Sequence, residues 1–383
     1  MRVIYLLLLG TLALTSRTDV TDAEVAQVQE SVLLIDTHND TPMKVMDGYD
    51  IATPRPGGST DLQKLRAGNV AAVFFAAYVP KKYAKRGGSA AYCRKAIEAI
   101  RSGIVGKHPN DFVLARTADE IEAAHRQGKI AALIGIEGGH AIENSTKLLR
   151  EFFDSGARYM TLTHTNTNGW ADSSGDKPKY GGLNALGRSI VAEMNRLGMI
   201  VDISHVSDET FRDVIETSRA PVFASHSSCR ALTKSKRNMT DDMLRALAKN
   251  GGVLQVNFAC DFLNEKVRTD RHAEKTRLGK KFGDDMDGLR AVVEKKYARA
   301  SLADVVAHID HAVKVAGIEH VGIGSDFDGI DCTPVGLEDY SKFPALTRAL
   351  LERGYTAKQI QKLYGGNTLR LMRDVERAAK ASK

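Results

Sequence analysis

The sequence predicts a (β/α)8 barrel in the α/β class, and three observations lead to that prediction. Short apolar runs recur eight times along the 383 residues, as strands buried on both faces of a parallel sheet do. Helical patterns separate most of these runs, and Gly128, Gly156, Gly198 and Gly317 follow helix ends, where a left-handed residue is favoured. No repeat or long low-complexity linker divides the chain, so we expect residues 17–383 to form one barrel domain with C-terminal helices.

Each strand is expected from one apolar run. In order, these runs are Val32–Asp36, Val70–Tyr78, Ile130–Ile136, Arg158–His164, Ile200–Ser204, Val222–Ser225, Gly252–Asn257 and Val321–Ser325. The clearest helices between them are Ala90–Val105, Ala118–Gln127, Lys147–Ser155, Leu186–Leu197, Asp208–Thr217, Thr240–Lys249 and Leu302–Ala316, followed by helices near Leu337–Arg353 and Asn367–Ala379. The alternative is a doubly wound open sheet, but no glycine-rich phosphate-binding motif follows any strand.

The composition is that of an ordinary globular protein, with 43% hydrophobic and 26% charged residues. Lys and Arg number 54 and Asp and Glu 47, which gives a net charge of +7. This mild excess does not require nucleic acid, and no basic motif with interleaved aromatics supports it. We therefore expect no nucleic-acid partner.

The N-terminus has the pattern of a secretory signal peptide. Arg2 supplies a positive charge, Val3–Leu14 is apolar, and Ala13, Thr15 and Ser16 offer small residues for cleavage. We expect residues 1–16 to be removed, and the apolar run is shorter than the about 20 residues that span a bilayer. The last residues, ERAAKASK, carry no hydrophobic tail, so we expect no membrane anchor and a secreted or periplasmic protein.

Polar side chains collect at the carboxyl ends of the expected strands, where a barrel places its catalytic groups. Four histidines and several carboxylates occupy these positions, and such a group is costly to bury without a compensating ion. Imidazole and carboxylate together suit Zn²⁺ or a similar divalent ion. These strand-end residues include His38, Asp40, Glu137, His164, His205, His226 and Asp326, and they offer at least five metal ligands.

The number of ligands is enough for two metal ions. Glu137 is the natural bridge, because it alone projects from the third expected strand, between the His38–Asp40 pair and the later histidines. Two ions about 3.5–4 Å apart can hold a water between them, lower its pKa and polarise a carbonyl group. The sequence therefore predicts metal-assisted hydrolysis.

These residues stand within motifs that resemble the membrane (renal-type) dipeptidase family of binuclear zinc enzymes. The resemblance runs from about Leu33 to Asn367 and is that of a bacterial-type member without a lipid anchor. It rests on IDTHND, LIGIEGGHAIEN, LTHTNTNGWAD, VDISHVS, ASHSSCRAL, KSKRNMTDDML, GIGSDFDG and YGGNTLRLM.

The resemblance implies a role for each site residue. His38, Asp40 and Glu137 would hold one zinc, and Glu137, His205 and His226 would hold the other. His164 would stabilise the oxyanion. Arg237 would pair with the C-terminal carboxylate of the substrate, a group that a planar guanidinium suits well. Asp326 would hold the bridging water, accept its proton and pass it to the leaving amine.

The expected function is that of a zinc-dependent dipeptidase, with dipeptides carrying a C-terminal D-residue as a further substrate class. Mn²⁺ or Co²⁺ could replace the two Zn²⁺ ions, and the family resemblance implies a homodimer. The alternatives are hydrolysis of another small amide, such as an N-acyl amino acid or a β-lactam, and a non-catalytic metal- or peptide-binding protein. The complete ligand set favours the enzyme.

Several residues keep open interpretations. Among the four cysteines, Cys229 with Cys260 is the expected pair if a disulfide forms, since both follow adjacent strands. The histidines of His308-x-x-His311 are expected on an exposed helix face, and Asp328, His140 and Trp170 could serve the site or the loops around it. Residues 266–299 hold 11 Lys/Arg and 6 Asp/Glu. A solvated helical insertion is preferred there over a cover of the pocket that steers anionic substrates.

Overall fold

The computed structural model describes residues 17–282 and 285–381, so the expected signal peptide lies outside the described residues. Its strands form one parallel sheet in the order β1-β2-β4-β5-β6-β7-β8-β9, with β3 paired to β4 beside this path. The strands are β1 Leu34–Asn39, β2 Val70–Tyr78, β3 Phe112–Leu114, β4 Ile130–Glu137, β5 Ala157–Thr161, β6 Ile200–Asp202, β7 Phe223–Ser227, β8 Val253–Val256 and β9 Val321–Ile323.

The sheet curls into a nearly closed barrel, which confirms the predicted fold class. Its first and last strands meet through a parallel bridge between Asn39 and Phe327. Asp36 strengthens this seam, because its carboxylate accepts hydrogen bonds from the Ser325 amide (2.9 Å) and the Tyr340 hydroxyl (2.6 Å). The seam brings the carboxyl ends of β1 and β9 side by side.

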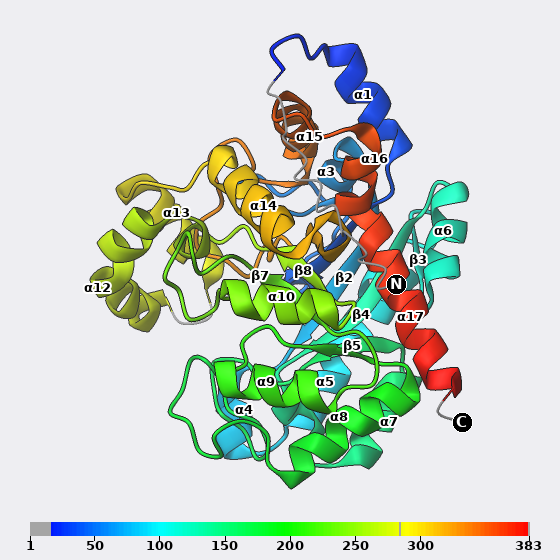
Figure 1. Cartoon of the computed structure of the whole chain (residues 1–383), viewed down its shortest axis with the longest axis vertical. Helices are drawn as coiled ribbons and strands as arrows, with labels where there is room; N and C mark the ends of the chain where they lie inside the picture. The colour runs from blue at the N-terminus through cyan, green and yellow to red at the C-terminus, as the bar shows by residue number, and fades with distance from the viewer. Residues whose placement is uncertain (1–16, 283–284, 382–383) are drawn as a thin grey trace, which may run out of the picture.

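Helices surround the barrel and follow most of its strands (Figure 1). They are α1 Asp22–Ser31, α2 Thr41–Met46, α3 Leu62–Ala67, α4 Lys81–Arg86, α5 Ser89–Glu98, α6 Ala118–Arg126, α7 Thr146–Asp154, α8 Ala185–Leu197, α9 Asp208–Thr217, α10 Asp241–Lys249, α11 Cys260–Leu263, α12 Glu265–Phe282, α13 Met286–Lys296, α14 Leu302–Ala316, α15 Phe343–Glu352, α16 Ala357–Gln361 and α17 Asn367–Ala381. The glycines predicted to follow helix ends all have positive φ, namely Gly128, Gly156, Gly198 and Gly317.

Strand β3 is the strand that the sequence analysis missed. It has three residues, too few for an apolar run to stand out, and it pairs along Ile130–Ala132 of β4 outside the barrel. The other eight strands coincide with the predicted runs, although several end earlier than predicted.

Alternation along the strands divides the core into two layers. On β2, Val73 and Phe75 face the surrounding helices, whereas Phe74 joins the interior of the barrel. Leu371 and Val375 of α17 belong to the interior cluster. Helix α17 therefore closes the amino end of the barrel and leaves the carboxyl end for polar side chains.

The disulfide prediction is wrong, because Cys260 pairs with Cys332 and not with Cys229. The bond joins the start of α11 to the loop after β9, across neighbouring strands β8 and β9. Cys229 is buried elsewhere: its amide donates to His308 Nδ1 (3.0 Å), and its thiol faces the His308 carbonyl.

The expectation that His308 is exposed is also wrong. Its side chain is buried in α14, with Nδ1 accepting from the Cys229 amide and Nε2 at 3.0 Å from the Leu263 carbonyl. His311 is half-buried and lies 2.7 Å from Asp241. Both histidines therefore join α14 to neighbouring segments. Within the described part of the chain, none of the helices is long and apolar enough to cross a membrane.

Candidate metal centre

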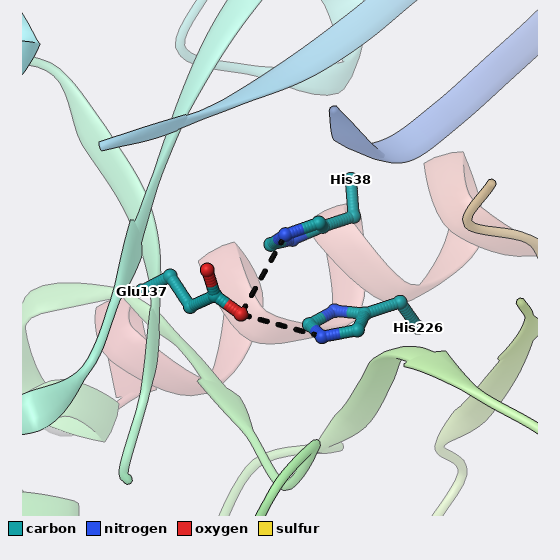
Figure 2. Close-up of side chains that lie close together, drawn as sticks. All are labelled: His38, Glu137 and His226. Carbon is teal, nitrogen blue, oxygen red and sulfur yellow. Dashed lines mark ion pairs between the residues drawn. The ribbon is translucent and has the colours of Figure 1, made fainter. Parts of the chain in front are cut away.

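Four imidazoles converge on one oxygen of Glu137, the last residue of β4. Oε1 lies 3.1 Å from Nε2 of His205 and 3.4 Å from Nε2 of His226. The corresponding distances to His38 and His164 are 3.7 Å and 3.8 Å. Figure 2 shows the His38 and His226 rings pointing from different strands toward the same carboxylate.

The site residues form three overlapping groups whose ligand atoms lie within 4.8 Å of one another. These groups are His38–Glu137–His226, Glu137–His164–His205 and His38–Asp40–Asp326. The five predicted metal ligands, together with His164 and Asp326, are therefore brought together at the carboxyl end of the barrel. Their individual roles stay a prediction.

Buried hydrogen bonds fix the orientation of two imidazoles. The Ser225 hydroxyl donates to Asp202 (2.6 Å) and lies 2.7 Å from His226 Nδ1, so it can accept the proton of that nitrogen. The Tyr159 hydroxyl lies 2.8 Å from His38 Nδ1. Both arrangements leave Nε2 directed at Glu137, and outer hydrogen bonds of this kind orient metal-ligating histidines.

Asp202 in turn ties three neighbouring strands together. Its carboxylate accepts from the amides of Ser204 and Ser225, both at 2.9 Å, and from the Thr161 hydroxyl at 2.5 Å. On the far side of the site, Asn257 donates to Asp326 Oδ2 (2.8 Å). His38, His226 and Asp326 are thus each held by a hydrogen bond with a neighbouring side chain.

Burial works against charge throughout this cluster. It raises the pKa of the Glu137 carboxyl well above 4.5 and that of Asp326 above 3.8. It also lowers the pKa of three imidazoles well below 6.5, those of His164, His205 and His226. Burial opposes the charge of His38 as well, but the Glu137 and Asp40 carboxylates raise its pKa to about 10.

These residues fit divalent metal ions. Among the described residues, Nε2 of His38 is buried without a hydrogen-bond partner, and Nε2 of His205 lies 2.9 Å from Nε2 of His226. Imidazole nitrogens gathered next to a carboxylate are the donor set of a nitrogen–oxygen metal site. A bound cation would stabilise the ionised carboxylates and the neutral imidazoles together.

The backbone is strained at the same place. Six non-glycine residues in the described ranges have positive φ, and three of them are His205 (67°), Asp326 (63°) and Asp328 (67°). Such conformations cost about 1–3 kcal/mol each and concentrate at functional sites. Gly329 completes the loop, because a Cβ there would lie 2.0 Å from Asp40 Oδ2 and 2.7 Å from Asp326 Oδ1.

A cavity of about 540 Å³ opens over this cluster. Arg237 lines it, donating to the His226 carbonyl (3.0 Å) and lying over the Phe262 ring. Its buried Nε has no hydrogen-bond partner in the described part of the chain. Met286 and Leu289 of α13 line the cavity too. The preferred interpretation of residues 266–299 as a solvated insertion is therefore incomplete, since part of this segment covers the site.

Two open interpretations are now decided. Asp328 organises loops, because its carboxylate accepts from the Thr41 hydroxyl (2.7 Å) and the Ser59 amide (3.1 Å) and pairs with Arg55 (3.0 Å). Trp170 is fully buried and packs close to Gly139, so it anchors the loop after β5.

Sequence analysis missed the supporting residues Tyr159, Asp202, Ser225 and Asn257. A partial signal existed for two of them: Asp202 stands three residues before His205, and Ser225 directly precedes His226. Tyr159 offered none, because an interior tyrosine on β5 is a normal part of an apolar strand.

The fold and the site together define a class, that of barrel hydrolases with a metal-ligating cluster at the carboxyl end. Residues 22–383 match the profile of the membrane dipeptidase family, peptidase family M19. The chain therefore belongs to the membrane dipeptidase family and is a peptidase.

Individual relatives agree with this assignment. The chain is 38% identical over 369 residues to dipeptidase verJ of Clonostachys rogersoniana, covering 92% of this chain and 86% of that one. The probable dipeptidase PvdM of Pseudomonas aeruginosa matches with a TM-score of 0.83 and 26% identity, over 94% of this chain and 99% of that one. A Rhodobacter sphaeroides metallopeptidase, liganded with a phosphinate mimic of L-Ala-D-Ala, matches with a TM-score of 0.76 and 26% identity, over 90% and 99%.

Proposed function

We propose that this protein is a dipeptidase that uses two zinc ions. The observation that carries the proposal is the convergence of four imidazole Nε2 atoms on Glu137 Oε1 at 3.1–3.8 Å. His38, Asp40 and Glu137 would hold one ion, and Glu137, His205 and His226 the other. When bound, the two ions supply Lewis acidity and lower the pKa of the attacking water.

The chain's own residues would bind and orient the peptide. His164 stands beside Glu137 at the cavity wall, where its ring can donate to the carbonyl oxygen as negative charge develops. Asp326 has Oδ2 fixed by Asn257 and can exchange a proton at Oδ1, first from water and then to the leaving amine. Both groups face the same cavity.

Arg237 would set the length of the substrate. Its guanidinium lines the cavity a short way from the ligand cluster and keeps Nε free for an anion. Because a guanidinium pairs with a carboxylate through two parallel hydrogen bonds, it would select a peptide whose C-terminus is one residue beyond the scissile bond. Dipeptides with a C-terminal D-residue belong to the proposed substrates, in line with the L-Ala-D-Ala mimic bound by the Rhodobacter sphaeroides relative.

The proposal also covers location and assembly. The pattern of residues 1–16 supports export to a periplasmic or extracellular compartment. The disulfide between Cys260 and Cys332 supports an oxidising environment. Family membership supports a homodimer.

A panel of dipeptides tests the proposed reaction. Ala-Ala, its L,D diastereomer and the two C-terminal amides would be assayed before chelation, after chelation and after zinc is restored. We expect cleavage of the free dipeptides that is lost on chelation and regained with zinc. Amides should react at least about tenfold more slowly, because the charge-assisted pair with Arg237 is absent.

Two outcomes would contradict the proposal. Cleavage that survives complete metal removal would exclude the metal-dependent reaction. Equal rates on amides and free dipeptides would exclude the role of Arg237, and a matched Arg237→Lys variant would show whether the planar guanidinium or charge alone is needed.

A further inference from the structure

A second cavity, of about 850 Å³, adjoins the one over the ligand cluster. The two cavities share Lys81 and Thr165 in their walls. Lys81 is the first residue of α4, which follows β2, and Thr165 follows His164 in the loop after β5. The two cavities are therefore neighbours, with Lys81 and Thr165 between them.

The second cavity is positively charged. Its lining includes five cationic side chains, those of Lys81, Lys82, Lys85, Arg86 and Lys179, and two carboxylates, Glu143 and Asp176. The carboxylates are engaged with backbone amides: Glu143 accepts from Ala90 (3.1 Å) and Asp176 from Thr167 (3.1 Å). Within the described residues, Lys81, Lys85 and Arg86 form no ion pair.

Part of the wall of this cavity has a strained and closely packed backbone. Glu143 and Asn144 both have positive φ, 47° and 61°, so the non-glycine strain outside the ligand cluster falls mainly here. Asn144 packs so closely on Gly169 that a Cβ there would lie 2.3 Å from its Oδ1.

The charges in the metal-centre cavity point to the ligand. Its described carboxylates are Asp40, Glu137, Asp326, Asp328 and Asp331, and its described cations are Arg237 and Lys81. Arg237 has a proposed anion, the C-terminal carboxylate of the dipeptide. Lys81 faces the same substrate with no anion assigned to it, so a second carboxylate on the substrate would complete the charge pairing.

We propose that the second cavity is a subsite for the side-chain carboxylate of an acidic residue in the dipeptide, with Lys81 at its entrance. The inference rests on the proposed dipeptidase function and names its substrate class. A glutamate in either position of the dipeptide supplies the same chemistry, and the assay distinguishes the two positions.

The test compares glutamate with glutamine, which has the same shape without the charge. The substrates are Ala-Glu against Ala-Gln and Glu-Ala against Gln-Ala, with Ala-Ala as the neutral reference. We expect the ratio of kcat/KM for Glu over Gln to be at least about tenfold in one of the two pairs at low salt. The ratio should fall as ionic strength rises, because exposed cations are screened.

Variants locate the effect. Lys81→Ala should reduce the Glu/Gln ratio about tenfold, and Lys81→Arg should restore most of it. The double variant Lys85→Ala/Arg86→Ala should reduce the ratio less, since these residues line the second cavity alone. Lys249→Ala is the matched control: it removes one exposed charge at the end of α10 and should leave the ratio unchanged.

The outcomes separate this inference from the proposed function. If Ala-Ala is cleaved but neither Glu/Gln ratio exceeds one, or if Lys81→Ala changes the ratio no more than Lys249→Ala, the acidic subsite is wrong and the dipeptidase stands. If no dipeptide is cleaved by the zinc-loaded protein, the proposed function itself fails.

Discussion

The carboxyl and amino ends of the barrel differ in the kind of side chain that they bury. At the carboxyl end, Glu137, His38, His205 and His226 are buried. His205, Asp326 and Asp328 there adopt left-handed backbone. At the amino end, Leu371 and other apolar side chains of α17 pack against the interior faces of the strands. One end buries ionisable groups, and the other buries hydrocarbon.

The difference shows where stability and chemistry reside. Buried ionisable groups and positive φ at non-glycine residues each destabilise the metal-free protein, whereas apolar burial stabilises it. The amino end must therefore offset the carboxyl end. Substitutions at the carboxyl end should change metal binding and catalysis, and those at the amino end should change stability.

The largest expected effect belongs to Glu137→Gln. The variant keeps the shape of the side chain and removes the charge on which four imidazoles converge, so kcat/KM should fall at least about a thousandfold. Thermal unfolding in the presence of a chelator should show no loss of stability, because burial in the metal-free protein already disfavours the charge that the substitution removes. A destabilised metal-free variant would show that Glu137 serves the fold.

Leu371→Ala should do the reverse. Leu371 is fully buried, and its truncation should lower the free energy of unfolding by about 2–5 kcal/mol. KM for dipeptides and the metal content at 25 °C should not change. Denaturant unfolding measures the loss in the free energy of unfolding, with Leu232→Ala at an exposed position as the control. An altered metal content of Leu371→Ala would contradict the separation of the two ends.

Ser225→Ala sharpens the comparison within the carboxyl end. Removing the hydroxyl that lies 2.7 Å from His226 Nδ1 should weaken metal affinity about 10–100-fold. Competition with a chelator of known affinity measures the change. The matched control is Ser189→Ala, an exposed serine that bonds a carbonyl within α8, and it should bind metal as the wild type does.

The smallest effect is expected at Glu193, which belongs to neither end. Hydrogen bonds from Arg196 and Arg150 lower its pKa from 4.5 to about 2. Because the pKa of Glu193 is lower in the folded protein than in the unfolded chain, its hydrogen bonds to the two arginines stabilise the fold above about pH 4.5. This stabilisation is lost as the pH falls toward 2. Glu193→Gln should cost less than about 1 kcal/mol at pH 7, since Arg150 is half exposed. A cost that persists at pH 2 in denaturant unfolding would contradict this.

The sequence predicted the barrel because parallel strands buried on both faces leave continuous apolar runs, as in Val70–Tyr78. It predicted the ligand candidates because polar residues such as Glu137 and His226 stand directly at strand ends. The sequence did not predict strand β3, because three residues are too few to show a hydrophobic pattern.

The remaining misses depend on three-dimensional neighbours. The partner of Cys260 depends on the pairing of β8 with β9, which brings Cys332 to a Cα–Cα distance of 5.6 Å. The burial of His308 follows from the packing of α14 against the loop at Cys229, which helical spacing does not show. The supporting bonds of Tyr159 and Asp202 likewise arise from strand register.

Metal content tests the central claim most directly. Elemental analysis of the purified protein after zinc loading and dialysis should find two zinc ions per chain, and dipeptidase activity should rise with occupancy. Glu137→Gln should retain less than half of this metal, because both proposed ions share its carboxylate. A wild-type protein that binds no stoichiometric metal, or a Glu137→Gln variant that keeps both ions, would contradict the account.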